Sequence, residues 1–275
     1  MLALATALLA ASAAATVEVR PTATRPGDAV LLVVAGAEGE PPATLEGRPV
    51  RFWRTSDGWR ALAGLPVETP VGPLPIRALA GGATLEARLE VIDPAFPARE
   101  LTVPPRFVEP PASVRARIAA DQRAFDAAFS RPFAPPRFAQ PFDWPLRAEA
   151  TGRYGDRRTF NGKQQSQHYG VDLDAAAGTP VLAANDGLVV MARDNYYAGL
   201  TVLLWHGADL YSAYFHLSRA DVKVGGTVAR GDRLGLSGAS GRATGPHLHW
   251  GTKVGGRWVD PESILRLGAF ASIRP

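Results

Sequence analysis

Cysteine is absent from this chain of 275 residues. The absence excludes a disulfide framework, a cysteine nucleophile and a Cys-based zinc site, so any metal site has to use histidine and carboxylate ligands. Blocks of lysine and arginine interleaved with aromatic residues are also missing, so the mildly basic balance, with a net charge of +4, does not indicate nucleic-acid binding. That balance suits an anionic polymer such as a cell wall, and ordinary arginine-rich composition explains it equally well.

No apolar run is long enough to span a membrane as a helix, which takes about 20 residues. The longest run, at residues 1–15, matches the apolar region of a secretory signal and ends in A-x-A patterns. We therefore expect a signal peptide, a periplasmic or secreted protein, and no stable membrane span after cleavage. The run lacks the basic residues that usually open a signal, so a clipped start or the tail of a membrane anchor is the alternative.

Glycine and proline are plentiful, with 28 and 24 residues, and this composition favours short strands and turns over long helices. Residues 16–95 alternate short apolar stretches with Gly/Pro turns, which predicts a small, Ig-like β-sandwich module. Its candidate strands are residues 16–20, 29–34, 50–53, 74–78 and 85–91. The module carries no histidine, and we interpret it as a positioning or wall-binding unit, with a plain spacer as the alternative.

A Pro-rich linker follows at residues 96–142, with one helix expected at residues 112–130 because the apolar side chains there share one face. Residues 143–267 return to short apolar runs between turns, which predicts an antiparallel, mostly β domain that contains all five histidines. Its candidate strands are residues 180–183, 187–191, 200–205, 210–215, 233–236 and 247–250.

The histidines carry the chemistry of this domain. His247 and His249 are two positions apart on a candidate strand, so their side chains project to one face and Leu248 turns into the core. His168 and Asp172, four apart, can share a second face. Two imidazoles and one carboxylate would supply three ligands for a zinc ion that keeps a fourth position for water, and some of the remaining histidines are left for proton transfer.

Alternative roles for these histidines fit the sequence less well. Histidine packed in a core is the plainest alternative, but H-x-x-x-D and H-x-H occur together here. Cupins follow H-x-H with a glutamate, whereas Trp250-Gly-Thr-Lys-Val follows here. Metal-dependent amidohydrolases place H-x-H near the start of a TIM barrel, whereas this one lies near the C-terminus with no βα alternation after it. H-E-x-x-H, a P-loop and G-x-S-x-G are absent.

A series of short motifs runs through residues 160–262. They are F-N-G at 160–162, H-Y-G-V-D-L at 168–173, A-A-G-T-P-V at 176–181, A-N-D-G at 184–187, L-W-H-G at 204–207, Y-F-H-L at 214–217, V-K-V-G-G at 222–226, G-A-S-G at 238–241, T-G-P-H-L-H at 244–249 and V-D-P at 259–261. Together they resemble the catalytic domain of the lysostaphin-type zinc endopeptidases, the bacterial Gly-Gly endopeptidase and murein DD-endopeptidase family. The N-terminal module lies outside these motifs.

The resemblance implies a role for each residue. His168, Asp172 and His249 would be the zinc ligands, His247 the general base, and His216 a second non-ligand histidine that holds water or stabilises the oxyanion. The implied function is an exported zinc metalloendopeptidase, with Zn²⁺ as cofactor, that hydrolyses peptide cross-links of bacterial peptidoglycan. The predicted fold is mostly β: a C-terminal antiparallel β-sheet metallopeptidase domain preceded by a small β-sandwich domain and a helical linker.

Three more residues of these motifs are interpreted separately. His206 is expected to be a structural histidine. Asn161 is a candidate to contact the substrate or the surroundings of the metal, and Tyr214 is a candidate to line the groove. For both residues, ordinary packing or a solvated loop is the alternative that we prefer.

Two non-enzymatic hypotheses stay open. One is a relative that binds and regulates other cell-wall hydrolases, which the intact ligand positions argue against; the other is a wall- or sugar-binding module with an incidental metal. Oligoglycine bridges and direct D-Ala–diaminopimelate cross-links require different grooves. The absence of a recognisable glycine-bridge targeting module favours the direct cross-link.

Overall fold

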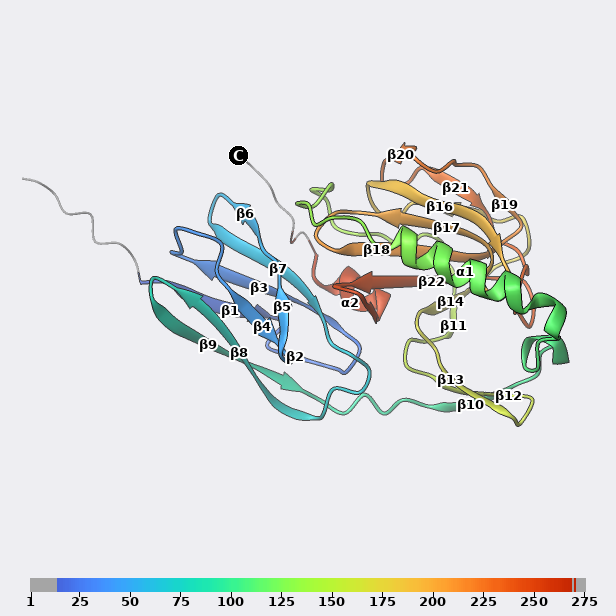
Figure 1. Ribbon diagram of the computed structural model, residues 1–275, viewed down its shortest axis with the longest axis horizontal. Helices are drawn as coiled ribbons and strands as arrows, with labels where there is room; N and C mark the ends of the chain where they lie inside the picture. The colour runs from blue at the N-terminus through green and yellow to red at the C-terminus, as the bar shows by residue number, and fades with distance from the viewer. Residues whose placement is uncertain (1–13, 269, 271–275) are drawn as a thin grey trace, which may run out of the picture.

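The computed structural model describes residues 14–268 and 270, and within them the chain is mostly β, as predicted. Figure 1 shows two β bodies side by side, the N-terminal one in blue and teal and the C-terminal one in yellow to red, with a green helix against the second. The predicted signal peptide lies almost wholly outside the described residues. In the part that is described, no helix is long and apolar enough to cross a membrane.

The N-terminal body is a small sandwich of two sheets that enclose a shared apolar core. The first sheet has the order β1 (Thr16–Arg20), β3 (Ala29–Ala35), β7 (Gly58–Gly64), β6 (Trp53–Thr55). The second has the order β2 (Ala23–Thr24), β9 (Ala83–Val91), β8 (Gly72–Ala80), β4 (Ala43–Leu45), β5 (Arg48–Val50). The predicted strand at residues 50–53 is wrong, because Val50 and Trp53 belong to different sheets and Arg51 and Phe52 make the crossing between them.

Strand β3 is buried on both faces, which explains its unbroken apolar run. Val30 and Leu32 belong to the sandwich core, whereas Leu31 and Val33 pack in the core of the C-terminal body. The short helix α2 (Pro261–Arg266) lies at this junction, and its Ser263 Oγ accepts a hydrogen bond from the backbone N–H of Ala29 at 2.9 Å. The two bodies are therefore packed against each other rather than merely tethered.

The C-terminal body is organised by an eight-stranded antiparallel sheet. Its order is β11 (Ala150–Gly152), β14 (Val171–Asp174), β22 (His247–Val254), β18 (Leu210–Leu217), β17 (Gly199–Trp205), β16 (Gly187–Asn195), β20 (Thr227–Val228), with β23 (Arg257–Val259) paired to β22. A smaller sheet has the order β15 (Pro180–Leu182), β21 (Arg233–Leu236), β19 (Arg219–Ala220).

The segment expected to be a linker takes part in this body. The predicted helix is confirmed as α1 (Arg115–Ala128), preceded by a 3-10 turn at Ala112–Val114, and it packs on the sheet through Ala128, Phe125 and Phe129. Before the helix, β10 (Ala98–Leu101) pairs in parallel with β12 (Arg157–Phe160), which in turn pairs with β13 (Gln164–Gln167). This three-stranded sheet forms one side of the site described next.

Candidate metal centre

The site is built where β14 and β22 run side by side. Asp172 on β14 lies directly opposite His249 on β22, and this pairing places their side chains on one face. His168 precedes β14 by a short turn through Gly170, where a Cβ would come within 2.6 Å of His249 Nε2. Glycine at position 170 therefore leaves the space that the His249 ring occupies.

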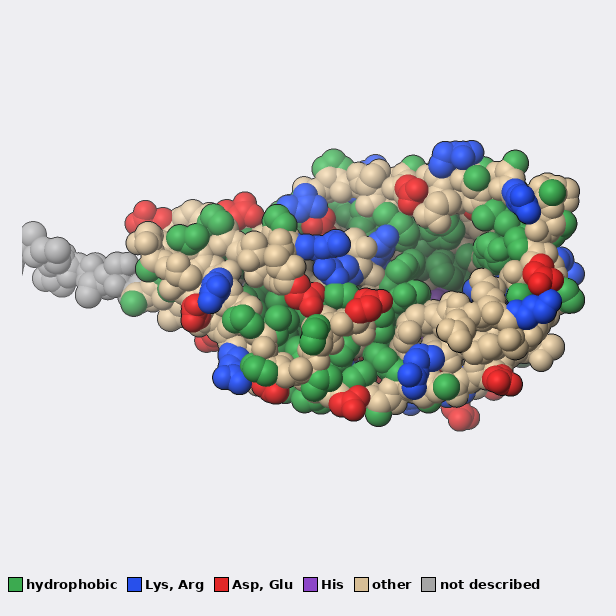
Figure 2. All heavy atoms as spheres, turned by 60° about the horizontal axis from the view of Figure 1, so that its bottom comes forward, with side chains coloured by type: hydrophobic (Ala, Val, Ile, Leu, Met, Phe, Trp, Pro, Cys, Tyr) green, Lys and Arg blue, Asp and Glu red, His purple; other side chains and the backbone are tan. Residues whose placement is uncertain are grey.

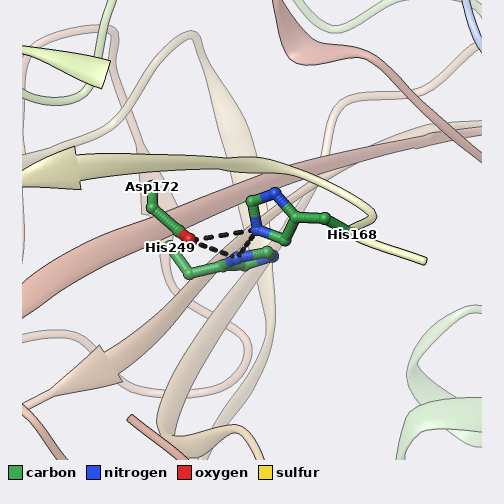
Figure 3. A group of neighbouring side chains, drawn as sticks. All are labelled: His168, Asp172 and His249. Carbon is green, nitrogen blue, oxygen red and sulfur yellow. Dashed lines mark hydrogen bonds and ion pairs between the residues drawn. The ribbon is translucent and has the colours of Figure 1, made fainter. Parts of the chain in front are cut away.

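Three side-chain atoms meet in this group: His168 Nε2, Asp172 Oδ1 and His249 Nδ1 (Figure 3). The His168 nitrogen lies 3.1 Å from the carboxylate oxygen and 3.0 Å from the His249 nitrogen, which is itself 2.8 Å from that oxygen. His168 Nδ1 lies 2.7 Å from the carbonyl oxygen of Arg153. Because a carbonyl only accepts, Nδ1 carries the proton and Nε2 presents its lone pair to the group.

This donor set fits a zinc ion. An imidazole lone pair, a carboxylate oxygen and a second imidazole nitrogen face one another in a place where all three side chains are largely buried, and a cation relieves their repulsion. Three protein ligands of this kind are typical of catalytic zinc, which keeps a fourth position open. Burial alone would raise the pKa of Asp172, but the neighbouring imidazoles of His168 and His249 lower that pKa well below its usual value, so the carboxylate stays ionised.

The second oxygen of the carboxylate is held from a different sheet. Arg158 on β12 donates from Nη2 to Asp172 Oδ2 at 2.7 Å, and both side chains are mostly buried. A Cβ at Gly152 would lie 2.4 Å from that Nη2 and 2.6 Å from Asp172 Oδ2, so only glycine fits between them. Arg158 was not predicted, because no sequence pattern links β12 to the H-x-x-x-D segment.

His247 and His216 flank the group without joining it. His247 Nε2 lies 3.7 Å from Asp172 Oδ1, and its Nδ1 lies 2.9 Å from the carbonyl oxygen of Gly245. His216 Nδ1 lies 2.8 Å from the carbonyl oxygen of Ser240, and its ring centroid is 4.9 Å from that of His247. Burial lowers the pKa of His216 to about 3 and that of His249 to about 4, which keeps both rings neutral.

A left-handed backbone turn at His216, with φ of 61°, brings its neighbour into the site as well. Regular alternation would place Phe215 and His216 on opposite faces of β18, but here both line the cavity. The Phe215 ring stacks on His249 with centroids 5.1 Å apart and an interplanar angle of 3°. Phe215 was not predicted, because the sequence does not reveal this break in alternation.

The remaining sequence candidates lie outside the group. His206 is fully buried between the carbonyl oxygen of Asp186 and Ser212 Oγ, at 2.6 and 2.7 Å. The Tyr214 hydroxyl is buried and accepts a hydrogen bond from the backbone N–H of Ala184. Asn161 accepts from Val103 N–H and donates to Val103 O, at 2.9 and 2.8 Å. These contacts are structural.

The group lies in a cavity of about 500 Å³ that opens on the surface of the C-terminal body, and a histidine is visible at the bottom of the hollow in Figure 2. The three-stranded sheet and the loop before β22 both contribute side chains to its lining. Aromatic and basic side chains line it beside the histidines: Phe160, Tyr169, Tyr197, Trp258, Arg99 and Arg242. The cavity is large enough for an extended segment of a peptide.

Comparison with known proteins decides the family. The model of peptidase family M23 matches residues 166–261, a span that contains all the residues of the metal group and both flanking histidines. A solved structure from Pseudomonas aeruginosa, described as a candidate M23 peptidase, is 32% identical with a TM-score of 0.66, covering 90% of this chain and 95% of that one. The chain belongs to peptidase family M23. The lysostaphin-type resemblance found in the sequence is thereby confirmed, and with it the expectation of a zinc-dependent peptidase fold.

Curated relatives match between about a third and a half of the chain. The peptidoglycan DD-endopeptidase ShyA of Vibrio cholerae is 48% identical over 98 residues, which is 36% of this chain and 23% of that protein. An uncharacterized metalloprotease of Haemophilus influenzae is 40% identical over 138 residues, which is 50% of this chain and 27% of that protein. The match thus spans about a quarter of the length of these relatives.

Proposed function

We propose that this protein is an exported zinc metalloendopeptidase that hydrolyses peptide cross-links of bacterial peptidoglycan, in the periplasm or outside the cell. The observation that carries the proposal is the meeting of His168 Nε2, Asp172 Oδ1 and His249 Nδ1 at one point in a cavity open to a peptide. Relatives named as peptidoglycan DD-endopeptidases support the substrate class.

The proposed ligands are His168, Asp172 and His249. When bound, zinc supplies Lewis-acid polarisation of the amide carbonyl and makes water more acidic. The Arg153 carbonyl fixes the tautomer of His168, and Arg158 holds the free oxygen of Asp172, so the donor atoms keep their directions before the ion arrives.

The proposed general base is His247. Its Nδ1 lies against the Gly245 carbonyl oxygen and therefore carries a proton, which leaves Nε2, on the side of the metal group, as the acceptor. In that orientation the ring takes a proton from the attacking water and returns it to the amine that leaves.

His216 has the same tautomer, because its Nδ1 faces the Ser240 carbonyl oxygen. In the neutral ring the remaining nitrogen is an acceptor, and an oxyanion requires a donor. We therefore favour the water-holding role for His216 over the oxyanion role, both of which the resemblance had left open.

The bond that we propose for cleavage is the direct D-Ala cross-link. The names of the curated relatives favour it over an oligoglycine bridge. We also propose that the N-terminal sandwich positions the enzyme on the wall, because its strand β3 packs against the catalytic body and is hydrogen-bonded to helix α2 of that body.

Digestion of purified peptidoglycan by the zinc-loaded full chain tests the proposal. We expect cross-linked dimers to be converted to monomers, the activity to vanish with a chelator and return with zinc, and His249→Ala to be inactive. A folded His249→Ala protein that digests as well as the parent would contradict the assignment. A parent that binds no zinc and cleaves nothing would favour the binding regulator instead.

A further inference from the structure

One wall of the cavity carries an arginine without a carboxylate partner. Arg242 lies in the loop before β22, and its backbone N–H donates to the Tyr197 carbonyl oxygen at 2.8 Å, which fixes the loop. Within the residues that the structure describes, no aspartate or glutamate oxygen lies within 4.0 Å of its guanidinium. The one side-chain hydrogen bond of Arg242 there goes from Nη1 to Gln164 Oε1, at 3.3 Å.

The other arginines of the cavity are neutralised. Arg158 pairs with Asp172 at 2.7 Å, and Arg99 pairs with Asp156 at 2.8 Å. Burial lowers the pKa of Arg242 and the charge of Arg158 lowers it further, whereas Tyr197 acts in the opposite direction without reversing the shift. The surroundings thus disfavour the charge of Arg242, and an anion beside it would remove that cost.

Aromatic rings hold this guanidinium in place. Its central carbon lies 4.4 Å from the ring centroid of Phe160 and 5.2 Å from that of Tyr197. Stacking of this kind uses the face of the guanidinium and leaves the N–H groups at its edge for hydrogen bonds. Because a carboxylate matches two such N–H groups at once, a stacked arginine without an acidic partner is a prepared carboxylate site.

We propose that Arg242, supported by Phe160 and Tyr197, is a subsite that binds a free carboxylate of the cross-linked peptide. The proposal rests on the proposed function, since peptidoglycan stem peptides carry free carboxylates beside their amide bonds. It assigns to Arg242 a part in choosing the substrate and none in the proton transfers. Amidation of the carboxylate that Arg242 binds would then lower the affinity of the enzyme for the substrate.

The test uses a defined dimer of two cross-linked stem peptides and derivatives in which one carboxylate at a time is converted to a carboxamide. We expect Arg242→Gln to lower kcat/KM for the free-acid dimer about tenfold or more, chiefly through KM, as expected for one charge-assisted hydrogen-bond pair. One of the carboxamide derivatives should have a kcat/KM with the parent that is lower by a similar factor than that of the free-acid dimer. With Arg242→Gln, the same derivative and the free-acid dimer should have equal kcat/KM. Arg242→Lys, which keeps the charge, should fall between them.

The matched control is Arg123→Gln, which removes an exposed arginine of α1 that does not line the cavity, and it should behave as the parent. Zinc content and thermal midpoint establish that Arg242→Gln is folded and loaded. The proposal is overturned if that protein cleaves the free-acid dimer as well as the parent. It is also overturned if Arg242→Gln lowers kcat/KM, relative to the parent, by the same factor on every carboxamide derivative as on the free-acid dimer. That result would indicate a structural role for Arg242.

Binding separates this subsite from the proposed function. In an inactive His247→Ala background, the affinity for the free-acid dimer should fall about tenfold when Arg242→Gln is added, and one carboxamide should abolish the difference. If the parent cleaves none of the dimers but this difference is found, the proposed reaction fails and the subsite stands. If the two proteins bind the free-acid dimer equally, the subsite fails whatever the activity.

Discussion

Arg158 and Asp172 join two sheets at the metal group: the guanidinium Nη2 donates at 2.7 Å to the carboxylate oxygen that faces away from the histidines. We predict that Arg158→Met lowers zinc affinity about 10- to 100-fold, as is typical when a partner of a metal ligand is removed. The carboxylate would lose its orientation and the cation that balances its burial. Competition with a chromophoric chelator measures the change.

The neighbouring residue supplies the control for this prediction. Arg157 lies on the same strand, but it is exposed and does not line the cavity, so Arg157→Met should bind zinc as the parent does. Equal affinities for the two variants would show that the pairing with Asp172 does not tune the metal site.

Gly152 gives a steric test of the same region. An added Cβ would overlap Arg158 Nη2 and Asp172 Oδ2, so Gly152→Ala should displace the carboxylate and reduce both zinc affinity and peptidase activity tenfold or more. Gly39→Ala is the matched control, because a Cβ there meets nothing within 4 Å. If Gly152→Ala keeps the parent's zinc affinity, the close approach is not required.

The local part of the site was readable from the sequence. Alternation on a strand predicted that His247 and His249 share a face and that Leu248 is buried, and the structure has Leu248 fully buried on β22. The mostly β architecture and helix α1 also followed from short-range patterns of apolar residues, glycine and proline. Such patterns are set by neighbours within a few positions, so one chain suffices to reveal them.

The missing parts depend on contacts between distant segments. Arg158 reaches Asp172 only because β12 packs beside the main sheet, and β12 pairs in parallel with a strand that precedes it by more than fifty residues. Phe215 enters the site because the backbone at His216 is left-handed, and a histidine in the sequence does not indicate that conformation. Arg242 gains its aromatic support from two segments that meet only in the fold.

His206 predicts a pH dependence of stability. Burial lowers its pKa from 6.5 to about 4 in the folded protein, so between these values the unfolded chain takes up a proton that the folded one does not. The free energy of unfolding should therefore fall as the pH drops through this window, by about 3 kcal/mol from this residue at 1.36 kcal/mol per pKa unit. Below the folded pKa the contribution should level off.

Comparison with His206→Gln isolates that contribution. Urea denaturation of parent and variant from pH 7 to pH 4, both with chelator, removes the effect of zinc and leaves the other histidines common to both. The gap between the two free energies should narrow as the pH falls. A gap that stays constant with pH would mean that His206 takes up its proton at the same pH in the folded and the unfolded chain, so that its burial does not suppress its charge.

His247 and His249 are two residues apart, and replacing them should have different effects on zinc content and activity. His249→Ala removes a proposed ligand, so zinc content and activity should fall together. His247→Ala removes a ring that lies 3.7 Å from Asp172 Oδ1 but outside the ligand group, so the protein should keep its zinc and lose activity by about 10²- to 10⁴-fold, the range for a general base. Metal analysis beside peptidoglycan digestion separates the two cases. A zinc-free His247→Ala protein would make this residue a ligand, and the proton would then have to be taken by a different group in the cavity.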